Sequence, residues 1–273
     1  MKLAYTISTS VTRFAAVAHA ADVCATVRLL AGMGFDGVEL AIRDPAHVEM
    51  DAIEETVRSL DIAVPAIGTG QAFVEEGLSL TAPEASRRDG AEARLLAQVG
   101  TAARFGALLI IGLIHGPVPP GGTQDQAEER LLPALSRIAQ AARRRGVRLV
   151  IEPINRYESN WLNTVDDVMK LLARLGEDNV GVLPDTFHMN IEEVDPAAAL
   201  RAAASRLWHV HVADSNRRAP GFGHLDLDAL VKGLSRVRYS GYVSAEILQH
   251  PTLEGAARQT VTTMRSLVPR GGA

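Results

Sequence analysis

The sequence has almost no cysteine, no long apolar run and no excess of positive charge. Cys24 is the only cysteine among 273 residues, which excludes an intramolecular disulfide and a zinc site built from cysteines. No stretch reaches the roughly 18 apolar residues of a membrane span, so we expect no membrane partner. With 28 basic and 32 acidic residues the net charge is −4, so a nucleic acid is not expected as the main partner.

Length and composition instead indicate an ordinary globular protein with a large core. Hydrophobic residues make up 47% of the chain and charged residues 22%, without a linker or a shift in composition. We therefore predict one domain over residues 1–273. Residues 6–13 contain Thr, Ser and Arg rather than the apolar core of a secretory signal, so we expect a cytoplasmic protein.

Short apolar runs alternate with longer segments that carry apolar residues at helical spacing. The expected strands are residues 3–7, 37–40, 63–67, 107–111, 147–151, 180–183, 207–210 and 242–245. The expected helices are residues 20–33, 48–60, 83–105, 124–145, 164–175, 196–205, 225–237 and 253–267, with a loose tail at 269–273. This alternation predicts an α/β fold, a single (β/α)₈ TIM barrel. An open, doubly wound parallel sheet is the alternative fold.

Four consecutive strands of this series end at residues that can bind a metal: Glu152, Asp185, His211 and Glu246. Their intervals of about 30 residues correspond to one strand plus one crossover helix. In a barrel these strand ends meet at the C-terminal face, where TIM barrels hold their active sites. Each residue taken alone could cap a helix or anchor a loop. The agreement of four strand ends favours one shared site, and an open sheet explains this convergence less well.

Of the three carboxylates and one imidazole at this point, the carboxylates would repel one another as bare anions. Two like charges about 4 Å apart cost about 4 kcal/mol at an effective dielectric constant of about 20. A divalent cation removes this cost. Ligands that are mostly oxygen, with one nitrogen, suit Mn²⁺, Mg²⁺ or Co²⁺ better than a structural zinc.

Other polar residues near strand ends have weaker support. Glu39 lies near the C-terminal end of the second strand, and no role is assigned to it. His209 lies two residues before His211 and is expected to fill the barrel interior, one layer deeper. The histidines at positions 19, 47, 115 and 250 lie away from the converging strand ends, so no ligand role is expected for them.

Several motifs around these positions resemble the sugar phosphate isomerase/epimerase superfamily, whose barrels are xylose isomerase-like. The motifs are EPINRYE (residues 152–158), DTFHMN (185–190), HVADSNR (211–217), PGFGH (220–224) and SAE (244–246). The resemblance runs over nearly the whole chain. It is closest to the ketose 3-epimerases that act on D-tagatose, D-psicose or L-ribulose. Residues 67–71, 77–81 and 105–112 are more similar to the 5-keto-L-gluconate epimerase branch.

The resemblance implies roles for the four residues at the strand ends. Glu152, Asp185, His211 and Glu246 match the metal ligands of the family. Glu152 and Glu246 also match its catalytic acid/base pair. The metal expected from this resemblance and from the ligand types is Mn²⁺, with Mg²⁺ or Co²⁺ as alternatives.

The resemblance also implies substrate contacts. His188 and Arg217 match residues that bind the sugar oxygens around C1 to C3, and Glu158 matches a further substrate-binding carboxylate. Where several family members carry aromatic residues that shape the pocket, this chain has Phe14 and Leu113. This difference leaves the preferred sugar open and does not affect the expected chemistry.

The function implied is a metal-dependent epimerase that inverts C3 of a ketose or keto-sugar acid through a cis-enediolate. The metal would polarise the carbonyl as a Lewis acid. One glutamate would remove the C3 proton and the other would return a proton to the opposite face. Relatives associate as dimers or tetramers, so a homo-oligomer acting on a small sugar is expected.

Three other functions remain to be separated from this one. An aldose–ketose isomerase, such as hydroxypyruvate isomerase, would use the same metal to move a proton between C1 and C2. A DNA-repair endonuclease with the same barrel would need a histidine-rich cluster of three metals and a basic face, and this chain has eight histidines and a net negative charge. A sugar-binding protein without catalysis would bind sugar and turn over none.

Overall fold

A computed structural model describes residues 1–267, and the predicted tail at 269–273 lies outside the described residues. Strands and helices alternate along the chain, and the strands form the predicted TIM barrel. The barrel strands are β1 (Lys2–Ser8), β3 (Gly37–Ala41), β4 (Ala66–Gly68), β5 (Leu108–Ile111), β6 (Leu149–Ile151), β7 (Val180–Val182), β8 (Val210–Val212) and β9 (Tyr242–Ala245).

All neighbouring strands are parallel, in the order β7-β6-β5-β4-β3-β1-β9-β8. Isolated bridges between Val182 and Leu207 and between Asp185 and His211 connect the two ends of this order. The amide of His211 donates to the carbonyl of Pro184 at 3.0 Å, so the sheet closes on itself. Closure brings the carboxyl ends of β6, β7, β8 and β9 to one side of the ring. The two-residue strand β2 (Ala18–His19) pairs with β1 outside this order.

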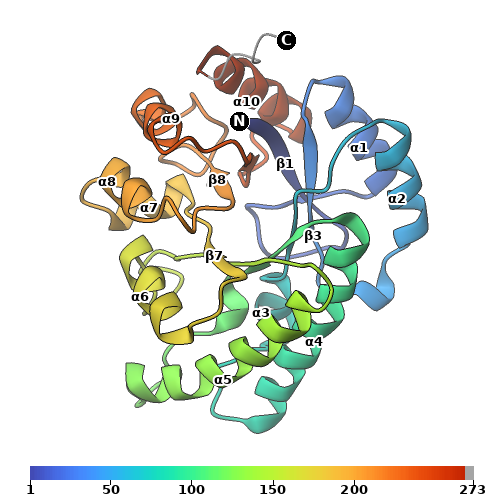
Figure 1. Ribbon diagram of the computed structural model, residues 1–273. Coiled ribbons are helices and arrows are strands. Elements are labelled where there is room, and N and C mark those ends of the chain that lie inside the picture. The colour runs from blue at the N-terminus through green and yellow to red at the C-terminus, as the bar shows by residue number, and fades with distance from the viewer. Residues whose placement is uncertain (268–273) are drawn as a thin grey trace.

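The helices that the sequence predicted form a ring around the strands, following one another in chain order (Figure 1). They are α1 (Val23–Gly32), α2 (Met50–Ser59), α4 (Ala85–Phe105), α5 (Gln124–Arg143), α6 (Val165–Leu175), α8 (Pro196–Ala202), α9 (Leu227–Arg236) and α10 (Leu253–Leu267). Local sequence sets several of their starts. Thr123 and Thr164 each form a capping box with the third residue of the helix, Gln126 and Asp167.

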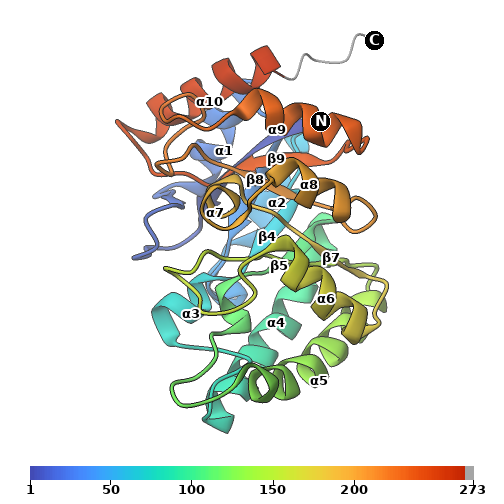
Figure 2. The ribbon, with the colours of Figure 1, turned by 90° about the vertical axis from the view of Figure 1, so that its left-hand side faces the viewer.

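Two short helices were not predicted, α3 (Gln71–Glu76) and α7 (Thr186–Glu192). Single 3₁₀ turns also occur at η1 (Pro45–His47) and η2 (Leu113–His115). Helices of one or two turns repeat the apolar spacing too few times to give a periodic signal, and α8, which is as short as α7, was predicted where Pro196 follows Asp195. Figure 2 shows α3 and α7 on the side that also carries the loop after β1. They follow β4 and β7 and therefore cover the C-terminal end of the barrel.

The interior of the barrel has an apolar layer and a polar layer. The apolar layer is formed by Ala66, Leu108, Ile110, Val150 and Leu183, with Trp208 packed against it. The polar layer holds side chains that are less than a tenth exposed, namely Thr6, Glu39, Glu152, Asp185, His209, His211, Ser244 and Glu246. A buried layer of this polarity is costly unless its groups are paired or bind a ligand.

The predicted boundaries of the seventh strand, 207–210, are wrong. Regular pairing covers Val210–Val212, and Leu207 forms only an isolated bridge to Val182. His211 therefore lies inside the strand rather than after it. The register is set by pairing of Val210 with Val243 and of Val212 with Ala245, which the local sequence does not reveal.

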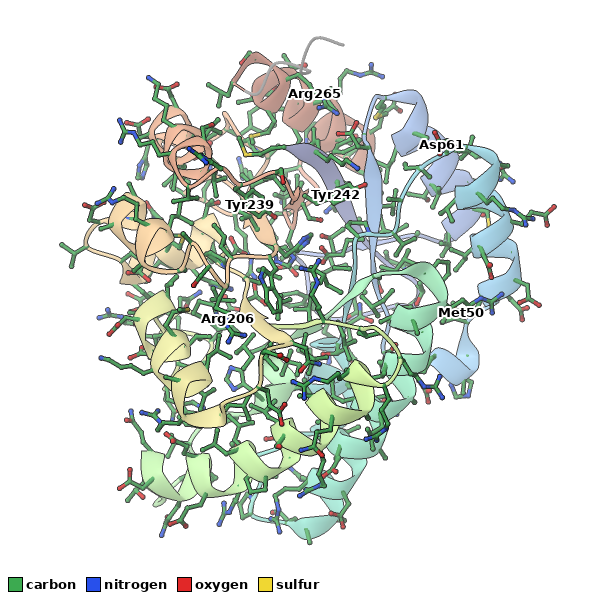
Figure 3. The ribbon with its side chains drawn as sticks, in the orientation of Figure 1. Met50, Asp61, Arg206, Tyr239, Tyr242 and Arg265 are labelled. Carbon is green, nitrogen blue, oxygen red and sulfur yellow. The ribbon has the colours of Figure 1, made fainter. Side chains whose placement is uncertain are left out.

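The N-terminal end of the barrel is held by side chains that bind backbone carbonyls. Arg206 donates to the carbonyls of Glu177, Asp178 and Val180 at 3.1, 2.8 and 3.0 Å. The hydroxyl of Tyr239 donates to the carbonyl of Tyr242 at 2.7 Å. Figure 3 labels Arg206, Tyr239 and Tyr242 within the ring of helices. Among the described residues, no helix combines the length and apolarity that crossing a membrane requires.

Candidate active site

The structure brings together the four residues predicted at the strand ends. Glu152 follows β6, Asp185 follows β7, His211 lies in β8, and Glu246 follows β9. Each offers one ligand atom, and these atoms all lie within 4.8 Å of one another. All four side chains are buried. The four residues form a compact cluster of three carboxylates around one imidazole, which we call the carboxylate cluster.

His211 and Asp185 are oriented by the elements that carry them. The Nδ1 atom of His211 lies 3.3 Å from Oε1 of Glu152 and 3.9 Å from Oε1 of Glu246. Oδ1 of Asp185 accepts the amide of Phe187 at 2.8 Å and so caps the start of α7. The second oxygen of Asp185, Oδ2, remains available to the carboxylate cluster.

Three atoms of the carboxylate cluster are buried without a hydrogen-bond partner among the described residues. They are Oε1 of Glu152, Oδ2 of Asp185 and Nδ1 of His211. Unpaired buried polar atoms of this kind are rare, because each loses its hydration without compensation. A cation between them would supply the missing partner. The residues present therefore fit a metal ion, with oxygen and nitrogen donors and without thiolates.

Glu39 lies behind the carboxylate cluster and was not predicted to take part. Its carboxylate lies 2.7 Å from Nε2 of His209 and 3.0 Å from Nε2 of His211. An ionised carboxylate can only accept, so both histidines donate to Glu39 through Nε2. As a metal ligand His211 would be neutral and would offer the lone pair of Nδ1 to the ion. His209 faces the interior as expected. The one sequence signal for Glu39 was a carboxylate inside an otherwise apolar strand.

The two glutamates proposed for catalysis differ in proton affinity in the absence of a metal. Burial, together with the charge of Glu152, raises the pKa of Glu246 to about 8. Burial also acts to raise the pKa of Glu152, but contact with His211 and the charge of Arg217 hold it below its ordinary value. Burial lowers the pKa of His211, whereas the charge of Glu39 and contact with Glu152 bring it well above the ordinary value. The site therefore pairs one ionised with one protonated glutamate near neutral pH.

The three predicted substrate-binding residues lie in one hydrogen-bond network beside the carboxylate cluster. Nη1 of Arg217 donates to Glu158 at 2.7 Å, and Nη2 donates to Glu246 at 3.3 Å. Asn155, which was not predicted, donates through Nδ2 to Glu158 at 3.0 Å and lies 2.7 Å from Nδ1 of His188. His188 therefore carries its proton on Nε2, which lies 3.9 Å from Glu152.

A pocket borders the carboxylate cluster, with about 500 Å³ of empty space that includes open solvent. Its polar lining residues include Glu158, His188 and Arg217. Its apolar lining residues include Phe14, Val17, Ile110, Leu113 and Ile154. A lining that combines charged and apolar groups suits a small polyhydroxylated molecule, which presents hydroxyl groups and C–H faces.

The barrel and its carboxylate cluster match a known family. Residues 27–267 match the family described as Xylose isomerase-like TIM barrel, and the chain belongs to this family. L-ribulose 3-epimerase of Mesorhizobium japonicum is 34% identical over 216 residues, 78% of this chain and 71% of the relative. D-psicose 3-epimerase of Agrobacterium fabrum is 30% identical over 227 residues, 81% of this chain and 77% of the relative. The chain is thus placed among the sugar epimerases, enzymes of the isomerase class, and the predicted resemblance is confirmed.

A solved structure supports the same fold. The apo form of 3-keto-D-glucoside 4-epimerase from E. coli has a TM-score of 0.82, with 24% sequence identity. The comparison covers 97% of this chain and 100% of that chain. The predicted TIM barrel is therefore confirmed by its similarity to an experimental structure.

Proposed function

We propose that this protein is a metal-dependent ketose 3-epimerase. The observation that carries the proposal is the position of two carboxylates, Glu152 and Glu246, whose Oε1 atoms lie 3.3 and 3.9 Å from Nδ1 of His211. Inversion of a carbon next to a carbonyl requires a base on one face and an acid on the other. A single base would return the original sugar or move the carbonyl along the chain.

The residues of the pocket divide this reaction between them. One of the two glutamates takes the proton from C3, and the other delivers a proton to the opposite face of the same carbon. In the reverse direction the two glutamates exchange roles. Arg217 and the Nε2–H group of His188 bind the sugar oxygens on which negative charge develops as the C3 proton leaves. The Nε atom of Arg217 is buried without a hydrogen-bond partner among the described residues.

Glu152, Asp185, His211 and Glu246 would hold the metal, and a bound divalent ion supplies Lewis acidity that makes the C3 proton easier to remove. We propose Mn²⁺ as the metal, with Mg²⁺ or Co²⁺ as alternatives, because the donors comprise three carboxylates and one imidazole.

The charge of the pocket favours a free ketose over a phosphorylated sugar or a keto-sugar acid. Among the described residues that line the pocket, Arg217 is the only Lys or Arg. Two of its nitrogens already bind Glu158 and Glu246. An anionic substituent would thus enter an acidic pocket without a cation to receive it. The curated relatives, named for L-ribulose and D-psicose, agree with an uncharged substrate.

The test is incubation of the Mn²⁺-loaded enzyme with a panel of ketoses in D₂O, followed by NMR. The expected result is a new ketose with deuterium at C3. Failure to label C3 in every sugar would contradict the proposal. Label at C1 would instead indicate the aldose–ketose isomerase. A 3-keto glycoside belongs in the panel, because the structurally similar E. coli enzyme is named as a 4-epimerase.

Glu246→Gln separates catalysis from binding. The amide cannot exchange a proton with C3, so the expected result is loss of turnover with retention of sugar binding. A wild type that binds sugar as tightly as the variant, with no turnover in either protein, would indicate a binding protein.

We further propose that all 273 residues form one domain, and that the enzyme is cytoplasmic and acts as a dimer or tetramer without nucleic-acid or membrane partners. A single half-buried cysteine, Cys24, is compatible with a reducing compartment. Light scattering coupled to size-exclusion chromatography would measure the subunit number, and a monomer would contradict this part of the proposal.

A further inference from the structure

The loop that carries Arg217 surrounds one buried carboxylate, Asp214. Oδ1 of Asp214 accepts the amide protons of Ser215 and Leu225 at 2.7 and 3.0 Å, and Oδ2 accepts that of Gly221 at 2.7 Å. Asp214 is only 1% exposed. Backbone N–H groups from both ends of the loop thus bind one side chain. The loop spans residues 213–225 and is called the Asp214 loop below.

The backbone of Asp214 also forms hydrogen bonds with the backbone of Arg217 and of Arg218. The amide of Arg217 donates to the carbonyl of Asp214 at 2.8 Å, and the amide of Asp214 donates to the carbonyl of Arg218 at 2.9 Å. Arg217 has φ of 59°, in the left-handed region. For a residue with a Cβ atom this region is less favourable by about 1–2 kcal/mol, so contacts with the surrounding structure must hold Arg217 in this conformation.

This backbone conformation directs the Arg217 side chain into the pocket. Its guanidinium lies 5.2 Å from the ring centre of Phe14 and 4.8 Å from that of Phe187. Its carbonyl accepts the amide of Leu248 at 2.7 Å, which ties the Asp214 loop to the segment just after Glu246. Arg217 therefore connects the loop to the proposed catalytic glutamate through both its side chain and its backbone.

The glycines of the Asp214 loop fit the carboxylate closely. A Cβ atom on Gly223 would lie 2.2 Å from Oδ1 of Asp214. Gly221 has φ of +93°, and a Cβ atom there would lie 2.8 Å from the side chains of Gln259 and Thr263. Both positions require glycine for the loop to close around Asp214. The loop is thus packed tightly around a group that does not line the pocket.

We propose that Asp214 is a positioning residue for the epimerase reaction. Its carboxylate fixes the Asp214 loop so that Arg217 keeps its left-handed backbone and holds its guanidinium between Glu158, Glu246 and the sugar. This inference rests on the proposed function, because it assigns Asp214 its effect through Arg217. The alternative is that Asp214 only stabilises the fold.

The first test compares Asp214→Asn with Arg217→Ala. The amide of Asn would place a donor against one of the N–H groups now bound by the carboxylate, so the loop and Arg217 are expected to shift. A shift of about 1 Å in a positioning group can lower the rate about 100-fold, so a 10- to 100-fold loss of kcat/KM is expected. The fraction of the loss that appears in kcat and the fraction that appears in KM should be the same in Asp214→Asn as in Arg217→Ala. A different distribution between kcat and KM would contradict the inference.

A double-mutant cycle distinguishes positioning from a general structural role. If Asp214 acts through Arg217, adding Asp214→Asn to Arg217→Ala should lower kcat/KM by less than about threefold. An equal loss in both backgrounds would overturn the inference. Asp195→Asn is the matched control, since Asp195 caps helix α8 and does not line the pocket, and its kcat/KM should equal that of the wild type.

Two further measurements do not depend on Asp214→Asn being active. Gly223→Ala keeps the carboxylate of Asp214 but displaces it. Its loss of kcat/KM should be distributed between kcat and KM as in Arg217→Ala. Gly32→Ala is the control, because no atom lies near its new Cβ. Amide hydrogen exchange across residues 213–225 should speed up in Asp214→Asn, whereas unchanged protection would contradict the inference. Hydrogen exchange tests the role of Asp214 even if the wild type turns over no sugar. Absence of turnover by the wild type would contradict the proposed function and not the exchange result.

Discussion

His115 is a buried histidine that takes no part in the proposed active site. Its Nδ1 atom donates to the carbonyl of Gly116 at 2.7 Å, and its ring packs edge-on against Trp161. Its Nε2 atom has no hydrogen-bond partner among the described residues. Burial lowers the pKa of His115 to about 4, which makes this residue sensitive to acid.

The stability of the protein should therefore fall below pH 6.5 partly because of His115. In the unfolded chain His115 binds a proton near its ordinary pKa, whereas in the folded protein it stays neutral down to about pH 4. The stabilising contribution is complete above the ordinary pKa, and about 2 kcal/mol of it is lost on going to pH 5. The measurement is urea unfolding at pH 7 and pH 5 in the presence of a chelator.

The comparison uses His115→Gln, which removes the titrating group, and His47→Gln as an exposed control. The loss of unfolding free energy between the two pH values should be smaller in His115→Gln than in wild type and unchanged in His47→Gln. Equal pH dependence in all three proteins would show that His115 does not titrate as described.

Glu39 should control the metal affinity although it lies behind the carboxylate cluster. In Glu39→Gln the amide nitrogen would face an N–H donor of His209 or His211, so His211 would lose the partner that orients Nδ1. Removing such a partner costs about 10- to 100-fold in metal affinity. Calorimetric titration with Mn²⁺ measures this loss. Glu177→Gln, a buried glutamate bonded to Ser136 and Arg143, should bind Mn²⁺ like wild type. An affinity of Glu39→Gln within threefold of wild type would contradict the assignment.

At the scale of secondary structure, α7 begins at a candidate metal ligand. One oxygen of Asp185 caps the helix by accepting the amide of Phe187, and the other is one of the unpaired atoms of the carboxylate cluster. Asp185 would therefore serve both as the N-cap of α7 and as a metal ligand. The same helix carries His188, so the position of the cap also sets the position of a substrate contact.

Two substitutions of Asp185 separate these uses. Asp185→Asn retains a capping oxygen but loses the charge, whereas Asp185→Ala loses both. In metal-free protein, Asp185→Ala should be less stable than Asp185→Asn by about 1 kcal/mol, the usual cost of removing an N-cap. Both variants should lose high-affinity Mn²⁺ binding. Urea unfolding and calorimetry measure the two effects, and tight metal binding by Asp185→Asn would exclude Asp185 as a ligand.

At the scale of the whole molecule, the barrel unites residues from distant parts of the chain. Glu39 of β3 bonds to His209 and His211 of the β8 region, and Asp185 bridges to His211. The carboxylate cluster thus depends on the closure of the ring between β7 and β8. A cation bound there would hold neighbouring strand ends together and would stabilise the folded state alone.

Metal binding should therefore raise the melting temperature. At a free Mn²⁺ concentration of about 100 times Kd, the added stability is about 2.7 kcal/mol. For a chain of this length that corresponds to a rise of about 5 °C. Scanning calorimetry with Mn²⁺ and with EDTA measures the difference. Asp185→Asn should show no rise, and a wild type that melts at the same temperature under both conditions would argue against the metal site.

The alternation of strands and helices, the barrel and the positions of four strand-end residues follow from the sequence. Strands buried on both faces are continuous apolar runs, and the polar residue that ends such a run is visible locally. Glu152, Asp185 and Glu246 were found in this way. His211 was found at the right end of the barrel, although the strand boundary placed around it was wrong.

Only the tertiary structure decided which residues touch. The pairing of Glu39 with His209 and His211, the contact of Asn155 with His188, and the closing of the Asp214 loop around its carboxylate join groups through the register of the barrel or through loop turns. Local patterns record which residues are buried and where an element ends. They do not record distances between elements, because the strand register and the loop geometry arise only when the ring closes.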